Sequence, residues 1–476
     1  MASSATSPYS YYTEPFSQDE RPRRFLEAFA AILAHSNYGP ALDTFVRVSA
    51  KCARCTASCP VYEASQDPQD IPCHRSALML KVYRRYFTLG GQLKARLYDY
   101  YTLTDRQLDE MAESFWRCTA CKRCKASCPM GIDHAMITHL ARWILAESGV
   151  IPKALLVSVR EQLEGKTRNT SAIPAIAMKD SCEFLEEELE EVFPGHPIKF
   201  PMDVEGAEYV FFPAVSDYLM EADTLMGNAA VLHAIGASWT IGSHNFDGID
   251  YGLFYSDRMW EQIIQAQVAE LKRLGGKVML IGECGHASRA AKEGMQSFIP
   301  PEDRVPVVNC MELAYEAFVS GKLKLKPNVI EERTTYHDPC NIARSGWIVE
   351  QPREILRHIC KDFVEMTPRG RDNYCCGGGG GSVSIDEIKD FRMFIGGKTK
   401  AAQILATGAK YVVTPCANCK KQVGELLEAH KVDCERIGLH DLMIKALILG
   451  DPPAAETKNA AEATSSTNEP AQPQED

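Results

Sequence analysis

Apolar residues recur at two different spacings along this chain, and the change of spacing divides it into two structural parts. In the first part, an apolar series after Arg24 follows helical spacing and predicts a short amphipathic helix: Phe25, Leu26, Phe29, Ile32 and Leu33. Thr104 with Gln107 forms a capping box that opens another helix. Asp133 precedes a third helix, which Gly149 ends. The first part is therefore predicted to be mainly helical.

The second part, from about residue 205, alternates helical runs with short β-rich apolar runs. Residues 274–284 and 407–416 repeat one pattern, in which a helical run ends at glycine, an apolar run follows, and Cys284 or Cys416 comes at its end. Strands alternating with helices predict an α/β domain whose functional residues lie on loops at the strand ends. We interpret the second part as two pseudo-repeats, residues 205–330 and 331–450.

Composition and charge narrow the class of protein. The net charge of -11 and the pI near 5.7 argue against a nucleic-acid partner. Thirteen of the 18 cysteines lie in clusters with metal-ligand spacing, which indicates metal centres and a reducing compartment rather than a disulfide framework. Residues 1–20 have no signal-peptide pattern, and no stretch approaches the roughly 20 apolar residues that span a bilayer. Membrane association would therefore need a partner or a peripheral surface.

Eight cysteines of the first part match the spacing of bacterial ferredoxins. The second group, followed by Pro129, is a complete C-x2-C-x2-C-x3-C-P run: Cys118, Cys121, Cys124 and Cys128. The first group has Ser49 where its leading cysteine would stand, and Cys73 is the substitute. In such proteins the fourth cysteine of a run crosses to the other cluster. The predicted ligand sets of two cubane 4Fe-4S clusters are therefore Cys52, Cys55, Cys73 and Cys128, and Cys59, Cys118, Cys121 and Cys124.

These eight thiols leave no need for histidine ligands, so His134 and His139 are expected on helix surfaces. The alternative, two structural zinc sites, fits the ferredoxin spacing less closely. Residues 21–150 are thus predicted as a helical double-cluster ferredoxin domain, preceded by a flexible arm at 1–20 and followed by a connection at 151–204. Residues 451–476 are rich in Ala, Glu, Thr and Pro and are predicted to be a disordered tail.

Five further cysteines gather in the last repeat. Cys375 and Cys376 are adjacent and open a glycine run at 377–381, whereas the other three are Cys340, Cys416 and Cys419. Adjacent cysteines chelate one small ion poorly but can hold neighbouring irons of an extended cluster, and five thiols exceed the four of a structural zinc site. Glycines allow the backbone to approach such a cluster closely and to adopt positive φ. This pattern favours iron–sulfur over zinc.

The spacing of these five cysteines resembles the cysteine-rich domain of the heterodisulfide reductase catalytic subunit and its relatives. The strings at 337–344 (HDPCNIAR) and 282–287 (GECGHA) look closer to one branch, the cytoplasmic iron–sulfur subunits of membrane redox complexes in sulfate-reducing organisms. That branch includes the sulfite-reduction-associated and high-molecular-weight cytochrome c complexes. The resemblance implies that Cys340, Cys375, Cys376, Cys416 and Cys419 hold a non-cubane 4Fe-4S cluster at which a disulfide is cleaved. It also implies a membrane cytochrome b-like or quinone-reactive partner, with a small thiol/disulfide protein as a candidate substrate.

The earlier repeat has lost most of these ligands. Residues 213–215 (Pro-Ala-Val) stand where the first cysteine is expected, and residues 246–248 (Phe-Asp-Gly) replace the C-C-G. Only Cys284 remains of the last pair, so a single non-cubane cluster is predicted. Cys284 and His286 are expected to face that cluster, either as a redox thiol and proton donor or as a buried packing site. His337 precedes Cys340 closely and is expected to hydrogen-bond a cluster sulfur or to cap the strand end.

Taken together, the sequence predicts a cytoplasmic iron–sulfur oxidoreductase subunit that is attached to a membrane through partner subunits. Its fold class is an α-helical ferredoxin domain with two 4Fe-4S clusters, followed by an α/β cysteine-rich domain of two pseudo-repeats. Electrons would pass through the cubanes to or from the non-cubane cluster, where a disulfide/thiol substrate reacts. One alternative is an electron-relay subunit with no substrate of its own, and another is the iron–sulfur subunit of a glycolate- or lactate-type oxidase. Residues 377–381 are not interpreted as a phosphate-binding loop, because no G-x-G-x-x-G follows a strand.

Overall fold

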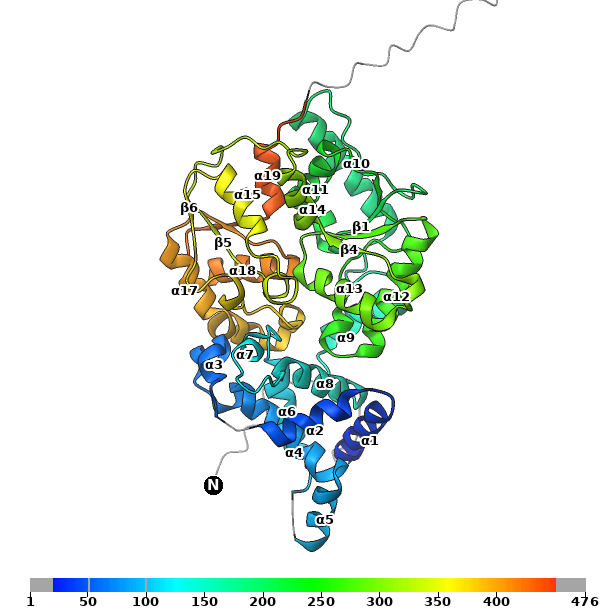
Figure 1. Ribbon diagram of the computed structural model, residues 1–476, viewed down its shortest axis with the longest axis vertical. Helices are drawn as coiled ribbons and strands as arrows, with labels where there is room; N and C mark the ends of the chain where they lie inside the picture. The colour runs from blue at the N-terminus through cyan, green and yellow to red at the C-terminus, as the bar shows by residue number, and fades with distance from the viewer. Residues whose placement is uncertain (1–19, 50–51, 99–100, 451–476) are drawn as a thin grey trace, which may run out of the picture.

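The computed structural model describes residues 20–49, 52–98 and 101–450. The predicted arm, except Glu20, and the predicted tail lie outside these ranges. The described chain forms a helical part at one end of the long axis and a part with two sheets at the other (Figure 1). Its fold class is thus helical with two small parallel sheets.

The helical part contains the elements α1 (Arg21–Ala34), α2 (Tyr38–Val48), α3 (Pro60–Ser65), α4 (Pro72–Phe87), α5 (Leu89–Leu97), α6 (Asp105–Trp116), α7 (Arg123–Ala126) and α8 (His134–Glu147). The predicted start signals are confirmed. Thr104 and Gln107 form the capping box of α6. Asp133 accepts hydrogen bonds from the backbone N–H groups of Ala135 (3.1 Å) and Met136 (3.0 Å) at the start of α8. Local capping chemistry therefore sets where both helices begin.

The segment predicted as a connection contains two helices, α9 (Lys153–Glu164) and α10 (Ala175–Val192). Leu155 and Val159 of α9 pack into the core of the helical part. Met178 and Leu185 of α10 pack into the core between the sheets. The segment therefore joins the two parts by belonging to both cores.

The two sheets have the same parallel topology. The first contains β1 (Tyr209–Phe212), β2 (Trp239–Thr240), β3 (Val278–Ile281) and β4 (Val307–Asn309) in the order β2-β1-β3-β4. The second contains β5 (Thr334–Tyr336), β6 (Phe363–Val364), β7 (Tyr411–Val413) and β8 (Glu435–Ile437) in the order β6-β5-β7-β8. Phe212 pairs with Ile281 at the ends of β1 and β3, as Tyr336 does with Val413 at the ends of β5 and β7. Loops that follow these central strands therefore begin at equivalent places.

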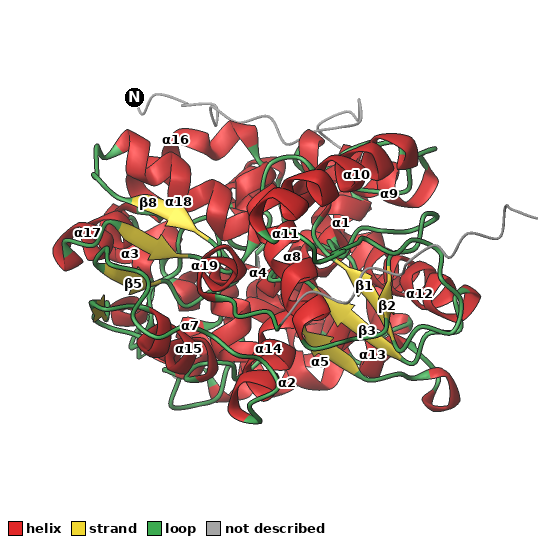
Figure 2. Ribbon diagram, turned by 90° about the horizontal axis from the view of Figure 1, so that it is seen from above, coloured by secondary structure: helices red, strands yellow, loops and turns green. Residues whose placement is uncertain are grey.

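Helices cover and connect the sheets. Those of the first half are α11 (Ala222–Ala234), α12 (Asp257–Arg273), α13 (Gly285–Phe298) and α14 (Cys310–Val319), and those of the second are α15 (Gln351–Ile359), α16 (Lys389–Phe391), α17 (Lys398–Thr407), α18 (Ala417–Ala429) and α19 (Leu439–Ala446). Figure 2 shows α11 and α19 between the two sheets. Gly227 of α11 lies so close to α19 that an added Cβ would be 2.4 Å from the carbonyl oxygen of His440. This close helix pair fixes one half against the other.

Candidate metal centres

The first group of cysteines lines a pocket at the far side of the helical part. Its members come from the loop after α2, from the first turn of α4 and from the loop after α7: Cys52, Cys55, Cys73 and Cys128. A hydrogen bond links the thiols of Cys55 and Cys73 and raises the pKa of Cys55. Ser49, which stands in place of the leading cysteine, lines the same pocket. The structure thus brings together one of the two expected sets of four.

The second pocket lies nearer the sheets and holds the other expected set: Cys59, Cys118, Cys121 and Cys124. Cys59 reaches it from the start of α3, and the other three come from the loop before α7 and from α7 itself. Both groupings match the crossed pattern derived from the ferredoxin spacing. That these thiols bind iron stays a prediction.

His134 and Arg75 lie beside these pockets and were not recognised from the sequence. His134 lines both pockets, is only 5% exposed, and has Nδ1 2.7 Å from Oγ of Ser76. Its expected position on a helix surface is therefore wrong, because α4 and α6 cover that face of α8. Burial lowers the pKa of His134 to about 4, so its imidazole is neutral. Arg75 is buried and donates to the carbonyl oxygen of Ser114 at 2.7 Å, which places a cation beside the second pocket.

His139 is not a surface residue either. Its Nε2 lies 2.7 Å from Oδ1 of Asp257, and its Nδ1 lies 2.9 Å from the carbonyl oxygen of Leu253. These contacts join α8 to the first half of the sheet part. A helical stripe in the sequence showed which face of α8 is apolar, but not that the remaining face would also be covered.

The third group consists of buried thiols on the segments that follow β5, β6 and β7. Sγ of Cys376 lies 3.4 Å from Sγ of Cys419, and the Cys375 thiol hydrogen-bonds with those of Cys340 and Cys376. Cys416 hydrogen-bonds with Cys419 in turn. All five predicted non-cubane ligands are therefore in one continuous set, and each is at most 7% exposed: Cys340, Cys375, Cys376, Cys416 and Cys419.

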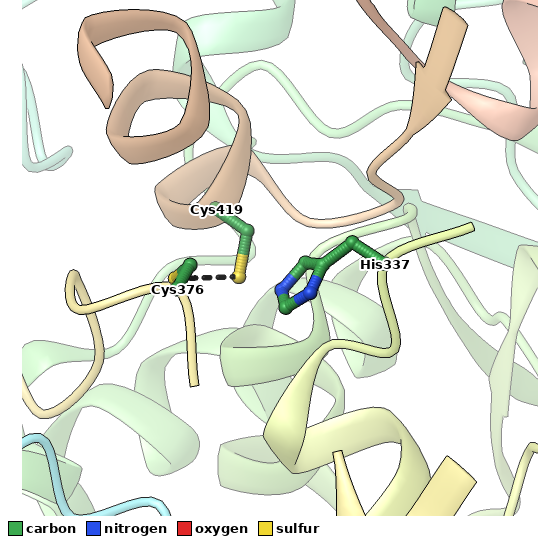
Figure 3. Close-up of side chains that lie close together, drawn as sticks. All are labelled: His337, Cys376 and Cys419. Carbon is green, nitrogen blue, oxygen red and sulfur yellow. Dashed lines mark hydrogen bonds between the residues drawn. The ribbon is translucent and has the colours of Figure 1, made fainter. Parts of the chain in front are cut away.

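His337 points into this set (Figure 3). A ring nitrogen of His337 and the sulfurs of Cys376 and Cys419 lie within 4.8 Å of one another. Neither ring nitrogen has any other hydrogen-bond partner among the described residues. Burial lowers the pKa of His337, so a neutral imidazole faces the thiols. Of the two roles expected from the sequence, this position suits contact with a cluster sulfur.

Cys284 and His286 differ in how they approach the thiols. Sγ of Cys284 lies 3.9 Å from Sγ of Cys416, and the side chain is 1% exposed. Cys284 is thus a sixth thiol next to the predicted ligands. His286 instead places Nε2 at the carbonyl oxygen of Asp250, and its ring packs 4.2 Å from that of Phe254. The geometry therefore separates a thiol adjacent to the site from a histidine held by the backbone.

In the first half, a carboxylate organises the loop that corresponds to the C-C-G loop. Asp247 is fully buried and accepts hydrogen bonds from Val215 N (3.2 Å), Ile249 N (2.8 Å) and Thr170 Oγ1 (2.7 Å). Ser216 is four residues beyond the end of β1, as Cys340 is beyond the end of β5, so counting from the strand ends pairs Cys340 with the residue directly after the 213–215 segment.

The second and third groups meet directly. The thiols of Cys121 and Cys375 hydrogen-bond with each other, although 253 other residues separate them in the chain. Arg344 donates to the carbonyl oxygens of Cys121 at 2.6 Å and of Asn373 at 2.9 Å, which holds both loops. Buried Arg142 likewise joins the carbonyl oxygens of Cys118 (2.6 Å) and Gly380 (2.7 Å). Arg344 and Arg142 therefore hold the helical part against the segment that carries Cys375 and the glycine run.

The glycine run explains how the loops approach so closely. An added Cβ would lie 2.6 Å from the carbonyl oxygen of Thr119 at Gly379, and 2.9 Å from that of Cys118 at Gly380. Gly377, Gly380 and Gly381 also have φ values of +98°, +63° and +81°. The expected positive φ is confirmed at these positions. The backbone that the run approaches is that of the loop beside the second pocket.

A cavity of about 670 Å³ opens beside the third group. Asn418, which lies between Cys416 and Cys419, lines it, and Oη of Tyr251 donates to Oδ1 of Asn418 at 3.3 Å. Burial raises the pKa of Tyr251, so its phenol stays protonated. Lys421 is exposed at the wall of the cavity, and Arg436 pairs there with Glu221 at 2.6 Å. This cavity could hold a small molecule or an extended peptide between polar and charged side chains, next to the segment that carries Cys416 and Cys419.

The family matches define the class of protein. Residues 50–132 match a 4Fe-4S dicluster domain, and residues 334–424 match a cysteine-rich domain, abbreviated CCG. These ranges contain the three groups of thiols described above, apart from Cys284. The chain thus joins a region that matches a 4Fe-4S dicluster domain to a region that matches a CCG domain.

Three similar proteins indicate which kind of iron–sulfur subunit this chain resembles. The chain is 26% identical over 472 residues to the Hdr-like menaquinol oxidoreductase iron–sulfur subunit 2 of Archaeoglobus fulgidus, covering 89% of this chain and 83% of that protein. A corresponding iron–sulfur subunit from Archaeoglobus profundus is 26% identical over 452 residues, covering 86% and 80%. One subunit of the dihydromethanophenazine:CoB–CoM heterodisulfide reductase of Methanosarcina barkeri is 26% identical over 416 residues, covering 85% and 94%. The resemblance to heterodisulfide reductase-like iron–sulfur subunits is confirmed.

Proposed function

We propose that this protein is the iron–sulfur subunit of a membrane-associated redox complex and that it acts on a disulfide/thiol substrate. Two cubane 4Fe-4S clusters would occupy the first two pockets, and one non-cubane 4Fe-4S cluster would occupy the third group. The clusters would supply one-electron transfer and iron sites for sulfur. The observation that carries the proposal is the direct contact of Cys121 with Cys375, because it joins the second pocket to the third group, which has a cavity on its other side.

The positions of this chain's residues favour one direction of electron transfer. Reduction of a disulfide takes two electrons and two protons and yields two thiols, so electrons would enter through the first two pockets while the substrate arrives from the cavity. Tyr251 and Asn418 would position the substrate at the end of this cavity, and Lys421 would attract an anionic one. Cys284, adjacent to Cys416, would lie beside the reacting sulfur. Pure electron relay needs no such cavity, so the cavity favours a substrate.

The two sheets have the same strand order. This supports the interpretation of residues 205–330 and 331–450 as pseudo-repeats, with the cluster retained only in the second.

Relatives named as menaquinol oxidoreductase and dihydromethanophenazine:CoB–CoM heterodisulfide reductase subunits support a quinone-reactive or cytochrome b-like membrane partner. The protein would accordingly be a cytoplasmic subunit that is attached to the membrane through such a partner. Among the residues that the structure describes, no helix combines the length and apolar character needed to cross a bilayer.

Iron analysis tests the proposal. Anaerobically purified protein is expected to contain about twelve irons and a matching amount of acid-labile sulfide per chain, as three four-iron clusters require. The oxidised protein is expected to show an electron paramagnetic resonance signal that changes when a thiol such as dithiothreitol is added, because the third site takes up sulfur. About eight irons with no thiol-sensitive signal would instead indicate a two-cluster relay.

Tyr251→Phe is expected to weaken thiol binding without loss of iron. The variant loses the hydrogen bond to Asn418, and a neutral bond worth about 1 kcal/mol corresponds to about a fivefold change in affinity. The measurement is the dithiothreitol concentration that gives half of the thiol-induced signal. Tyr315→Phe is the matched control, since it loses a 2.8 Å hydrogen bond to Glu354 outside the cavity. Equal thiol dependence in both variants would contradict a role of Tyr251 in the cavity.

A further inference from the structure

Helix α5 lies at the end of the molecule farthest from the sheets (Figure 1) and exposes a row of leucines. Leu89, Leu93 and Leu97 follow each other at intervals of four residues and therefore lie on one side of the helix. Their exposed fractions are 87%, 58% and 65%, and the next residue, Tyr98, is 72% exposed. Single exposed leucines are common, but a contiguous row of this kind marks an interaction surface.

The packing of α5 on α4 directs this row outward. Gly91 is buried on the opposite side of α5, where an added Cβ would lie 1.7 Å from the carbonyl oxygen of Arg84. Thr88, between the two helices, caps α5 by accepting from Gly91 N at 3.2 Å and donates to the same Arg84 carbonyl at 2.7 Å. Gly91 thus allows α5 to pack closely on α4, and the cap formed by Thr88 fixes the angle between the two helices. The leucine row faces away from the described chain as a consequence.

Positive charge surrounds the row. Residues 81–98 contain five Lys and Arg and no Asp or Glu, in a chain whose net charge is -11. At about 100° per residue, Arg96 and Lys94 lie on the two flanks of the leucine row, and both are exposed. A groove of about 590 Å³ next to α5 is lined by Arg47, Arg84 and Lys94, with Asp43 as its acidic residue. Asp43 accepts from Oη of Tyr83 at 2.8 Å.

We propose that α5 binds the surface of an anionic lipid bilayer, with its leucines in the interface and its cations at the lipid phosphates. Leucines flanked by Lys and Arg are the arrangement that interfacial helices use. The basic segment of an acidic chain suits anionic lipid by charge complementarity. This inference concerns attachment alone and does not rest on the chemistry of the third site.

The proposed attachment orients the electron route. Cys73 lies in the first turn of α4, and the end of α4 that leads to α5 is about 21 Å further along the helix axis at 1.5 Å per residue. The pocket of Cys52, Cys55, Cys73 and Cys128 would then be the one nearest the membrane. The cavity at Tyr251 and Asn418 does not include any residue of α4 or α5 and would stay open to the aqueous phase.

Vesicle flotation tests the proposal on the full iron-loaded chain. Binding is expected to phosphatidylcholine vesicles that contain phosphatidylglycerol, to be at least tenfold weaker without phosphatidylglycerol, and to fall as salt rises. The triple variant Leu89→Gln, Leu93→Gln, Leu97→Gln is expected to lose at least tenfold in binding with unchanged iron content. Lys94→Gln with Arg96→Gln is expected to reduce the preference for phosphatidylglycerol. Leu405→Gln is the matched control, because Leu405 is 63% exposed on α17, outside this surface.

Two results would overturn the proposal. One is no binding of the unaltered protein to either kind of vesicle, in which case the leucine row serves a protein partner or none. The other is equal binding by the triple glutamine variant and by Leu405→Gln. Unchanged iron content and an unchanged thermal unfolding midpoint in the triple variant separate a surface effect from misfolding, because all three leucines are exposed.

Discussion

Cys375→Ala is expected to lower the iron content from about twelve to about eight per chain and to abolish the thiol-sensitive signal. Cys375 hydrogen-bonds with Cys121, Cys340 and Cys376, so its loss removes the central thiol of the third group. Adjacent cysteines are the feature that suits an extended cluster, and four remaining thiols at this spacing do not replace it. The first two pockets contain none of the altered atoms and are expected to keep their iron.

The control for this variant is Cys360→Ala. Cys360 is also buried, with 3% exposure, but it lies outside all three groups of thiols. Its variant is expected to keep about twelve irons and the thiol-sensitive signal. Iron and acid-labile sulfide are measured on both proteins after anaerobic purification. An unchanged iron content in Cys375→Ala would refute a cluster at this site.

Arg142→Met is expected to destabilise the protein by about 3 kcal/mol or more, because it leaves several buried carbonyl oxygens without donors at about 1–3 kcal/mol each. The guanidinium is fully buried and donates to Phe115 (2.9 Å), Cys118 (2.6 Å) and Gly380 (2.7 Å). These bonds hold the loop of the second pocket against the glycine run. Methionine keeps the length of the side chain and removes every donor.

Two readouts distinguish this role from general stability. The unfolding free energy is measured by denaturant titration, and the rate at which the third site is reduced after the first two is followed by freeze-quench resonance spectroscopy. Arg142→Met is expected to slow that step, since the contact of Cys121 with Cys375 depends on the same loops. Arg106→Met removes a surface ion pair with Glu110 and is the control. A variant as stable as this control would show that the arginine is dispensable.

Much of the site was predictable because it rests on short-range patterns. The capping residues Thr104 and Asp133 act within one turn, so the starts of α6 and α8 followed from the sequence. Ligand spacing grouped the cysteines of the first two pockets, including Cys73 from a separate helix. The repeated helix–glycine–strand–cysteine pattern placed Cys284 just after β3 and Cys416 just after β7, whereas the contact of the two sulfurs depends on how the two halves pack together.

Other residues could not be predicted, since their surroundings come from distant segments. His134 was expected on a surface because its own helix shows only one apolar face, whereas α4 covers the other. Arg142 and Arg344 look like ordinary cations in the sequence until the loops that they join are placed side by side. The leucines of α5 resemble a core stripe by spacing, and only the packing of Gly91 on α4 shows that they face outward.

The sequence by itself determined which thiols are present, how they are grouped and what class of cofactor they suit, because ligand number and spacing are covalent properties of the chain. It also determined the order of helical and α/β parts, since hydrophobic periodicity reports local geometry. The tertiary structure decided that the second pocket touches the third group through Cys121 and Cys375, that a cavity opens at Asn418 beside the third group, and that the leucines of α5 are exposed. Each of these depends on how residues far apart in the chain pack together, which no local pattern encodes.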